Sequence, residues 1–156
     1  MSEFRFNYQE TTISQLPPII QNLSVAANDA CLLAYAPYSN FKVGAAILLS
    51  DGTVITGANQ ENASYPAGIC AERAALAKLN FNNTKLKVLA IAVIYNSKKA
   101  IDKPLAPCGF CRQVIMEVQT EQQTPIALFL CSPNGQVIVI DNAASLLPFV
   151  FTKTNL

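Results

Sequence analysis

Histidine is absent from the 156-residue sequence, and its absence excludes several kinds of catalytic site. Ser-His-Asp and Cys-His systems need an imidazole to move the proton of the nucleophile, and many zinc sites need one as a ligand. Charged residues are also scarce, at 13% of the chain, and the 11 basic residues are scattered. No basic stripe exists to neutralise a run of phosphates, which argues against a nucleic-acid partner.

Long apolar runs and a leader sequence are lacking as well. The longest apolar runs, such as residues 88–95, are too short to span a bilayer. Met1 to Arg5 show no basic region followed by an apolar one, so no signal peptide is expected. The chain has 5 cysteines, an odd number, and two of them form a C-x-x-C motif. This pattern favours metal binding in a reducing compartment over a disulfide framework. We therefore predict a cytoplasmic protein without membrane contact.

The length of the chain fits one domain over residues 1–156, in which residues 1–12 form an N-terminal arm. Apolar residues recur at helical spacing over 23–34, and a hairpin is expected over 41–59 with its turn at Asp51-Gly52. Further helices are expected at 70–79, 109–118 and 143–147, and further strands at 88–95, 126–131 and 137–140. This alternation predicts an α/β fold, a three-layer α/β/α sandwich around a mixed five-stranded sheet.

Two short stretches of the sequence carry chemical function: Cys70-Ala71-Glu72-Arg73 and Pro107-Cys108-Gly109-Phe110-Cys111. Three cysteine ligands leave one position of a tetrahedral zinc open, as catalytic zinc sites do. A cysteine followed by a glutamate that is not a ligand, and then by P-C-x-x-C, matches the layout of zinc deaminases. The cysteines should fall at helix starts, where the helix dipole stabilises thiolates.

These residues resemble the homotetrameric zinc-dependent cytidine deaminase family, whose members deaminate free cytidine and deoxycytidine. The resemblance runs from about residue 23 to residue 151 through segments in the order found in the family. These segments are YSNFKVGAA (38–46), GANQENA (57–63), SYPAGICAERA (64–74), PCGFCRQ (107–113) and LLPFVF (146–151). The resemblance implies the same three-layer fold, a zinc cofactor, a small-molecule nucleoside substrate and a homotetramer whose active sites are completed by neighbouring subunits.

The family resemblance also implies a reaction and a role for individual residues. Zinc would be held by Cys70, Cys108 and Cys111, and zinc hydroxide would attack C4 of the cytosine. Glu72 would shuttle protons, giving uridine or deoxyuridine and ammonia in pyrimidine salvage. Arg73 would contact the ligand sulfurs and tune the charge of the zinc centre. The substrate-binding residues would be Phe41, Asn59, Glu61, Ala71, Tyr65 and Phe151, the last two reaching a neighbouring subunit's site.

For Phe41 the residues alone favour a core position on a strand, and only the resemblance implies that it stacks on the pyrimidine. Asn59 and Glu61 have a physical rationale beside the resemblance. Asn59 and Glu61 alternate on an extended segment, so their side chains face one way. An amide and a carboxylate suit ribose hydroxyls, and the carboxylate would repel a 5′-phosphate, which favours a nucleoside over a nucleotide.

Three other functions are open at this point. A related enzyme could act on a blasticidin-type aminopyrimidine nucleoside. A non-catalytic structural zinc module would need a fourth ligand, for which Cys31, Cys131 or an acid is available. Both cysteines lie in apolar segments, where a free cysteine usually packs as a small hydrophobe. A polynucleotide-editing deaminase is disfavoured because the chain has no basic patch.

Overall fold

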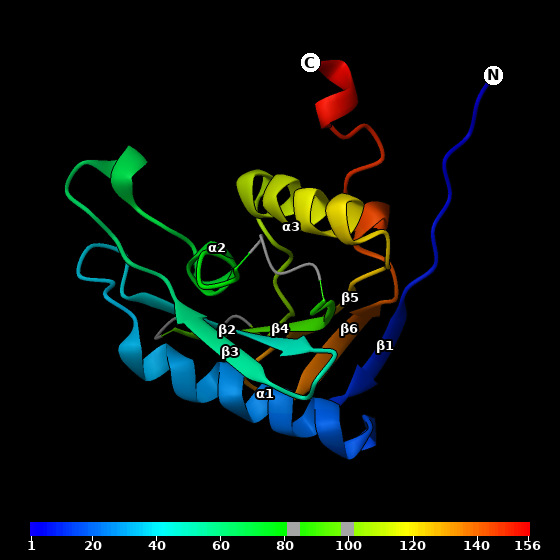
Figure 1. The fold of residues 1–156 in the computed structure, drawn as a ribbon. Coiled ribbons are helices and arrows are strands. Elements are labelled where there is room, and N and C mark those ends of the chain that lie inside the picture. Colours follow the sequence, from blue (N-terminus) through cyan, green and yellow to red (C-terminus); the bar gives the residue numbers. More distant parts are fainter. Residues whose placement is uncertain (81–84, 98–101) are drawn as a thin grey trace.

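A six-stranded mixed sheet forms the middle layer of the computed structural model, which describes residues 1–80, 85–97 and 102–156 (Figure 1). The strands are β1 (Gln9–Thr12), β2 (Phe41–Leu49), β3 (Val54–Ala58), β4 (Val88–Ser97), β5 (Ala127–Cys131) and β6 (Gln136–Ile140). They lie in the order β1-β6-β5-β4-β2-β3. Strands β4 and β5 run parallel and the other neighbours run antiparallel, so the predicted mixed sheet is confirmed.

Helices cover both faces of this sheet, which confirms the predicted three layers (Figure 1). Helix α1 (Pro18–Ala30) lies on one face, and helices α2 (Ala71–Leu76) and α3 (Gly109–Gln122) lie on the other. Side chains of the central strand β4 alternate between two cores. Ala92 and Ile94 pack toward α1, whereas Ile91 and Val93 pack toward α2 and α3. The site described below lies on the α2 and α3 side.

The predicted number of strands was wrong by one, because residues 9–12 of the expected N-terminal arm form a strand. Strand β1 pairs antiparallel with β6, with Thr12 opposite Gln136. Its sequence, QETT, is polar and mostly exposed, so no apolar alternation marks it as a strand. The alternating aromatics Phe4, Phe6 and Tyr8 precede the strand and are exposed. Pairing at the edge of the sheet, rather than burial, creates this element.

The turns follow the sequence, whereas the bounds of the helices differ from it. Helix α1 begins at Pro18, five residues before the range 23–34, and it ends at Ala30. Gly52 and Gly135 have positive φ angles in the predicted turns, a conformation that glycine adopts without strain. Helix α3 extends four residues past the predicted end, until Gln123 takes a left-handed conformation at φ 55°. Helix α2 is shorter than the predicted range 70–79. The helix predicted at 143–147 is a 3-10 turn over Ala143–Leu146.

Within the described ranges, no helix has both the length and the apolar character that a membrane crossing requires.

Gly57 of β3 allows helix α2 to approach the sheet closely. A Cβ atom built there would lie 2.4 Å from the backbone nitrogen of Ala75 and 2.6 Å from the carbonyl oxygen of Ala71. Any other residue would therefore push the helix outward. Because α2 begins directly after Cys70 and carries Glu72, this contact sets the height of both residues above the sheet.

Candidate metal centre and substrate pocket

Three cysteine sulfurs gather where α2 and α3 begin, as predicted. Cys70 directly precedes α2, Cys108 directly precedes α3, and Cys111 lies in the first turn of α3. The Sγ atom of Cys108 lies 3.7 Å from that of Cys70 and 3.5 Å from that of Cys111, and all three lie within 4.8 Å of one another. A tetrahedral zinc with Zn–S bonds of about 2.3 Å would place its sulfurs about 3.8 Å apart. The spacing of the sulfurs therefore fits zinc.

The protonation of the sulfurs also favours a bound cation. Hydrogen bonds from the thiols of Cys111 and Cys108 lower the pKa of Cys70 to about 5, against the opposing effect of burial, and the Arg73 charge adds to the decrease. The pKa of Cys111 is raised because its proton is held by Cys70 and the thiol is buried. Metal binding would replace these protons and give a set of three thiolates, which suits zinc.

No fourth ligand joins the three sulfurs from within the described part of the chain. Cys31 and Cys131, the candidates for closing the site, pack in the core between the sheet and α1, on the opposite face from the three sulfurs. Both are buried, as expected for cysteines that serve in packing. The fourth position of a bound zinc would therefore be free for water or substrate, as in catalytic zinc sites.

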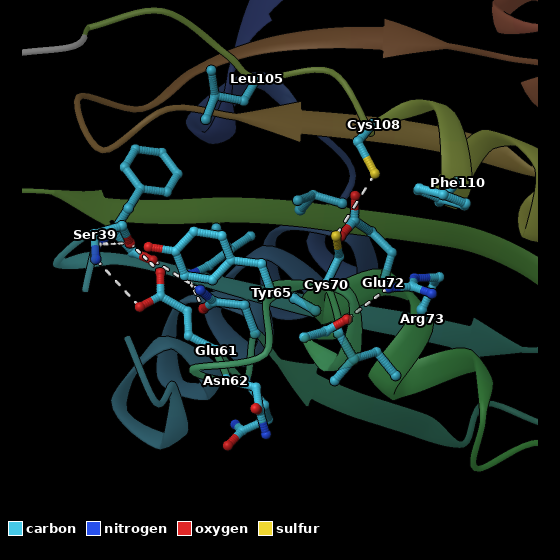
Figure 2. Close-up of a pocket in the computed structure, with 18 of the residues that line it drawn as sticks. Ser39, Glu61, Asn62, Tyr65, Cys70, Glu72, Arg73, Leu105, Cys108 and Phe110 are labelled. Carbon is cyan, nitrogen blue, oxygen red and sulfur yellow. Dashed lines mark hydrogen bonds between the residues drawn. The ribbon is translucent and has the colours of Figure 1, made fainter. Parts of the chain in front are cut away.

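Glu72 lies beside the sulfurs at the second residue of α2 and lines the cavity next to them (Figure 2). Only 5% of this glutamate is exposed. Burial raises the pKa of its carboxyl group, and the negative charge on Cys70 raises it further. A carboxyl group with a raised pKa holds a proton more readily than a free carboxyl group, which suits a group that acts as both base and acid. This position suits a proton carrier.

Arg73 places a cation close to Cys70. One of its terminal nitrogens donates to the carbonyl oxygen of Gly68 at 3.1 Å, and its Cζ atom lies 5.6 Å from the centroid of the Phe110 ring (Figure 2). Its buried Nε has no hydrogen-bond partner among the described residues. The guanidinium lowers the pKa of Cys70, so it lies near enough to offset the negative charge of a three-thiolate zinc site. The unsatisfied Nε–H donor of Arg73 also fits a negatively charged sulfur cluster close by.

A cavity of about 950 Å³ opens above the sulfurs and Glu72. The predicted site residues that line it are Phe41, Asn59, Glu61, Tyr65, Cys70, Ala71, Glu72, Arg73 and Cys108, whereas the buried Cys111 does not line it. Tyr65 lies at the rim, 77% exposed, and its ring contacts that of Tyr38. Phe151 does not line the cavity of its own chain. Its side chain is exposed, and its carbonyl oxygen accepts a hydrogen bond from Nε2 of Gln113 at 2.7 Å.

The amide of Asn59 holds strand β2 in place at the wall of the cavity. Its Oδ1 accepts from the backbone N–H of Val43 at 2.7 Å, and its Nδ2 donates to the carbonyl oxygen of Phe41 at 2.9 Å. An amide can make up to four hydrogen bonds, so this clamp leaves capacity for a ligand. Asn59 thus has a structural task that the sequence pattern does not reveal.

Glu61 is held by the turn that precedes β2. Its carboxylate accepts from the backbone N–H groups of Tyr38 at 2.9 Å and Ser39 at 3.2 Å, and from the Ser39 hydroxyl (Figure 2). The hydroxyl contributes most to lowering the pKa of Glu61, so the carboxylate stays ionised at neutral pH. Tyr38 and Ser39 were not predicted as site residues, because Pro37 to Asn40 indicate only a helix break. Their position within segment 38–46, which resembles the family, was the signal that could have identified them.

A three-layer α/β/α fold with three clustered cysteine sulfurs, and with a buried glutamate beside them that lines a cavity, defines a zinc hydrolase of the deaminase type. Comparison with known proteins agrees with this class. The family model described as "Cytidine and deoxycytidylate deaminase zinc-binding region" matches residues 19–126.

Individual relatives lead to the same family. The chain is 44% identical over 123 residues to the cytidine deaminase of Halalkalibacterium halodurans, which covers 79% of this chain and 86% of the relative. It is 36% identical over 137 residues to that of Sporosarcina psychrophila, which covers 88% and 94%. The crystal structure of cytidine deaminase from Burkholderia pseudomallei matches with a TM-score of 0.71 at 42% identity, covering 84% of this chain and 98% of that one. The chain belongs to the cytidine deaminase family.

Proposed function

We propose that this protein catalyses the zinc-dependent hydrolytic deamination of cytidine and deoxycytidine to uridine and deoxyuridine, with release of ammonia, in pyrimidine salvage. The observation that carries this proposal is the buried Glu72 carboxyl group beside a cluster of three cysteine sulfurs, where Glu72, Cys70 and Cys108 line one cavity. The cavity volume is in the usual range for small-molecule sites, about 300–1,000 Å³. The relatives named above, which are cytidine deaminases, support the same reaction.

The reaction replaces the amine at C4 of cytosine with oxygen from water, so protons must move between three atoms. Zinc held by Cys70, Cys108 and Cys111 would bring the pKa of a bound water to about 7, so that a nucleophile exists at neutral pH. The Glu72 carboxyl group would take one proton of the water and deliver it to ring N3. It would then take the second proton from the oxygen now bonded to C4 and deliver it to the departing amine, which leaves as ammonia while the C4 carbonyl forms. A single carboxyl group can perform these transfers because it alternates between base and acid.

The residues of the cavity wall would bind and orient the nucleoside. Phe41 would stack on the pyrimidine, and Ala71 would line the floor beside Glu72. Asn59 and Glu61 would bind the ribose hydroxyls with the hydrogen-bonding capacity that their contacts with the chain leave unused. The ionised Glu61 would repel a 5′-phosphate, so the substrate would be a nucleoside rather than a nucleotide.

We further propose that the protein is a homotetramer in which neighbouring subunits complete each active site. Large aromatic side chains are exposed at the cavity and on the C-terminal segment, namely Tyr65, Phe110, Phe149 and Phe151. Surface aromatic residues of this kind are enriched in protein interfaces. Tyr65 and Phe151 would contact the substrate of a neighbouring site. The five cysteines are all free, which supports a reducing compartment such as the cytoplasm.

One assay tests the proposed function. Purified protein is mixed with cytidine, and the loss of ultraviolet absorbance on conversion to uridine is followed while zinc is measured in the same sample. We expect turnover of cytidine and deoxycytidine, slow or no turnover of cytidine monophosphate, and about one zinc per chain. Faster turnover of a blasticidin-type nucleoside would indicate the related enzyme. Stoichiometric zinc without turnover of any nucleoside would indicate a structural zinc module.

A further inference from the structure

Tyr95 is a buried aromatic residue directly behind the base-stacking candidate Phe41. It lies on β4 with 2% of its surface exposed. Its ring centroid lies 5.2 Å from that of Phe41, and the two ring planes differ by only 13°. In the pairing of β2 with β4, Tyr95 is opposite Val43 and Phe41 is opposite Ser97. The two rings therefore share the face of the sheet that carries the cavity, and they form a parallel stack.

The hydroxyl group of Tyr95 makes a second connection. It donates to the carbonyl oxygen of Lys103 at 2.9 Å. Leu105, two residues further on, lines the cavity (Figure 2). Ala106 lines it as well. This segment continues to Cys108, one of the three proposed zinc ligands. One side chain thus connects the aromatic wall on β2 with the wall formed by residues 105–106.

We propose that Tyr95 is a positioning residue for the pyrimidine base, acting through Phe41. Tyr95 covers one face of the Phe41 ring, so the base would stack on the face that remains. This inference rests on the proposed function, in which Phe41 contacts the base. The stack fixes the plane of the Phe41 ring before the substrate arrives, which reduces the cost of ordering that ring on binding. The hydrogen bond to Lys103 fixes the segment that carries Leu105 and Ala106 relative to that plane.

A residue that only fills the core would have a different effect. Its loss would lower stability without changing the affinity for cytidine. Tyr95 does not line the cavity and is not among the groups proposed to move protons. Its replacement should therefore raise KM while leaving kcat nearly unchanged, which a role in packing alone does not predict.

Two variants of Tyr95 and one matched control test the inference. Tyr95→Leu removes both the stack and the hydrogen bond but keeps apolar bulk, whereas Tyr95→Phe keeps the stack. We expect Tyr95→Leu to raise the KM for cytidine about three- to tenfold, the range that loss of one aromatic pair supports, with kcat within about twofold and zinc unchanged. Tyr95→Phe should raise KM by about twofold. Ile91→Val, on the same strand and the same sheet face but distant from Phe41, should lower stability without changing KM.

A double variant shows whether Tyr95 acts through Phe41. In a Phe41→Leu background, Tyr95→Leu should have little further effect on KM, because the ring that it positions is gone. Additive effects of the two substitutions would overturn the inference, and so would a folded, zinc-loaded Tyr95→Leu protein with the wild-type KM. If Tyr95→Leu does not fold, an unchanged KM in Tyr95→Phe overturns it. A wild-type protein that fails to deaminate cytidine would instead contradict the proposed function.

Discussion

Substituting Gly57 with alanine should impair catalysis without changing any residue of the cavity. The new Cβ would lie 2.4 Å from the nitrogen of Ala75 and 2.6 Å from the oxygen of Ala71. Both are backbone atoms and cannot rotate away. To regain ordinary carbon contacts of about 3.5 Å, helix α2 would have to move outward by about 1 Å. The move would displace Glu72 relative to the sulfurs that α3 carries.

The size of the effect follows from packing and from the demands of catalysis. Overpacking of this kind costs about 1–3 kcal/mol of unfolding free energy. For a chain of this length each kcal/mol lowers Tm by about 2–4 °C, so we expect a decrease of about 2–12 °C. A shift of about 1 Å at a catalytic group can cost about a hundredfold in rate. We therefore expect kcat for cytidine to fall far more than the loss of stability explains.

Steady-state kinetics well below Tm, together with thermal unfolding, separate the two effects. Leu23→Ala is the matched control, because Leu23 is buried in the core on the α1 side, away from the site. It should cost about 2–5 kcal/mol and leave kcat nearly unchanged. Wild-type activity in Gly57→Ala despite a lowered Tm would refute the idea that the height of α2 governs Glu72. An unchanged Tm would refute the close contact itself.

Three further substitutions test other parts of the account. Cys108→Ala should abolish stoichiometric zinc, measured by metal analysis, and lower Tm, because the metal would link the starts of two helices. Glu61→Gln should lower kcat/KM for cytidine about ten- to a hundredfold, as expected for losing a charge-assisted hydrogen bond of about 1.5–3 kcal/mol, and should relax discrimination against cytidine monophosphate. Phe151→Ala should weaken assembly in light scattering, or raise KM, while zinc stays bound.

Each of these predictions has a contrary result. Cys131→Ala is the control for the first, because this buried thiol lies on the other face of the sheet and its loss should leave zinc in place. Full zinc in Cys108→Ala would remove Cys108 from the site. An unchanged preference between cytidine and its monophosphate in Glu61→Gln would show that Glu61 does not face the sugar. A fully active wild-type monomer would disprove the shared active sites.

The chemical centre could be predicted from the sequence because its parts are local. Cys108 and Cys111 are separated by less than one helical turn, and Glu72 follows Cys70 by two residues, so short motifs fix their relative positions. The apolar run that became β4 and the turn at Gly52 are equally local signals. The prediction that the two motifs lie side by side in the fold rested on the family resemblance, because residue spacing alone does not bring positions 70 and 108 together.

The features that sequence analysis missed depend on contacts between distant segments. Strand β1 is polar, so only its pairing with β6 reveals it. Asn59 accepts a hydrogen bond from Val43, which is 16 residues away in the sequence. Glu61 accepts one from Ser39, which is 22 residues away. The stack of Tyr95 on Phe41 joins neighbouring strands, and Tyr95 itself belongs to a continuous apolar run with no sign of a site. Such contacts require the three-dimensional register, which a single sequence does not specify.

The most direct test of the account is the Glu72→Gln variant, with turnover and zinc measured on the same preparation. Glutamine keeps the volume of the buried side chain but cannot take up and deliver protons as a carboxyl group does. If Glu72 is the proton carrier, zinc content and Tm should stay close to wild type while turnover of cytidine falls by at least about 10²- to 10⁴-fold. Near wild-type turnover with full zinc would contradict the mechanism. Loss of zinc would show that Glu72 is a ligand that closes the site.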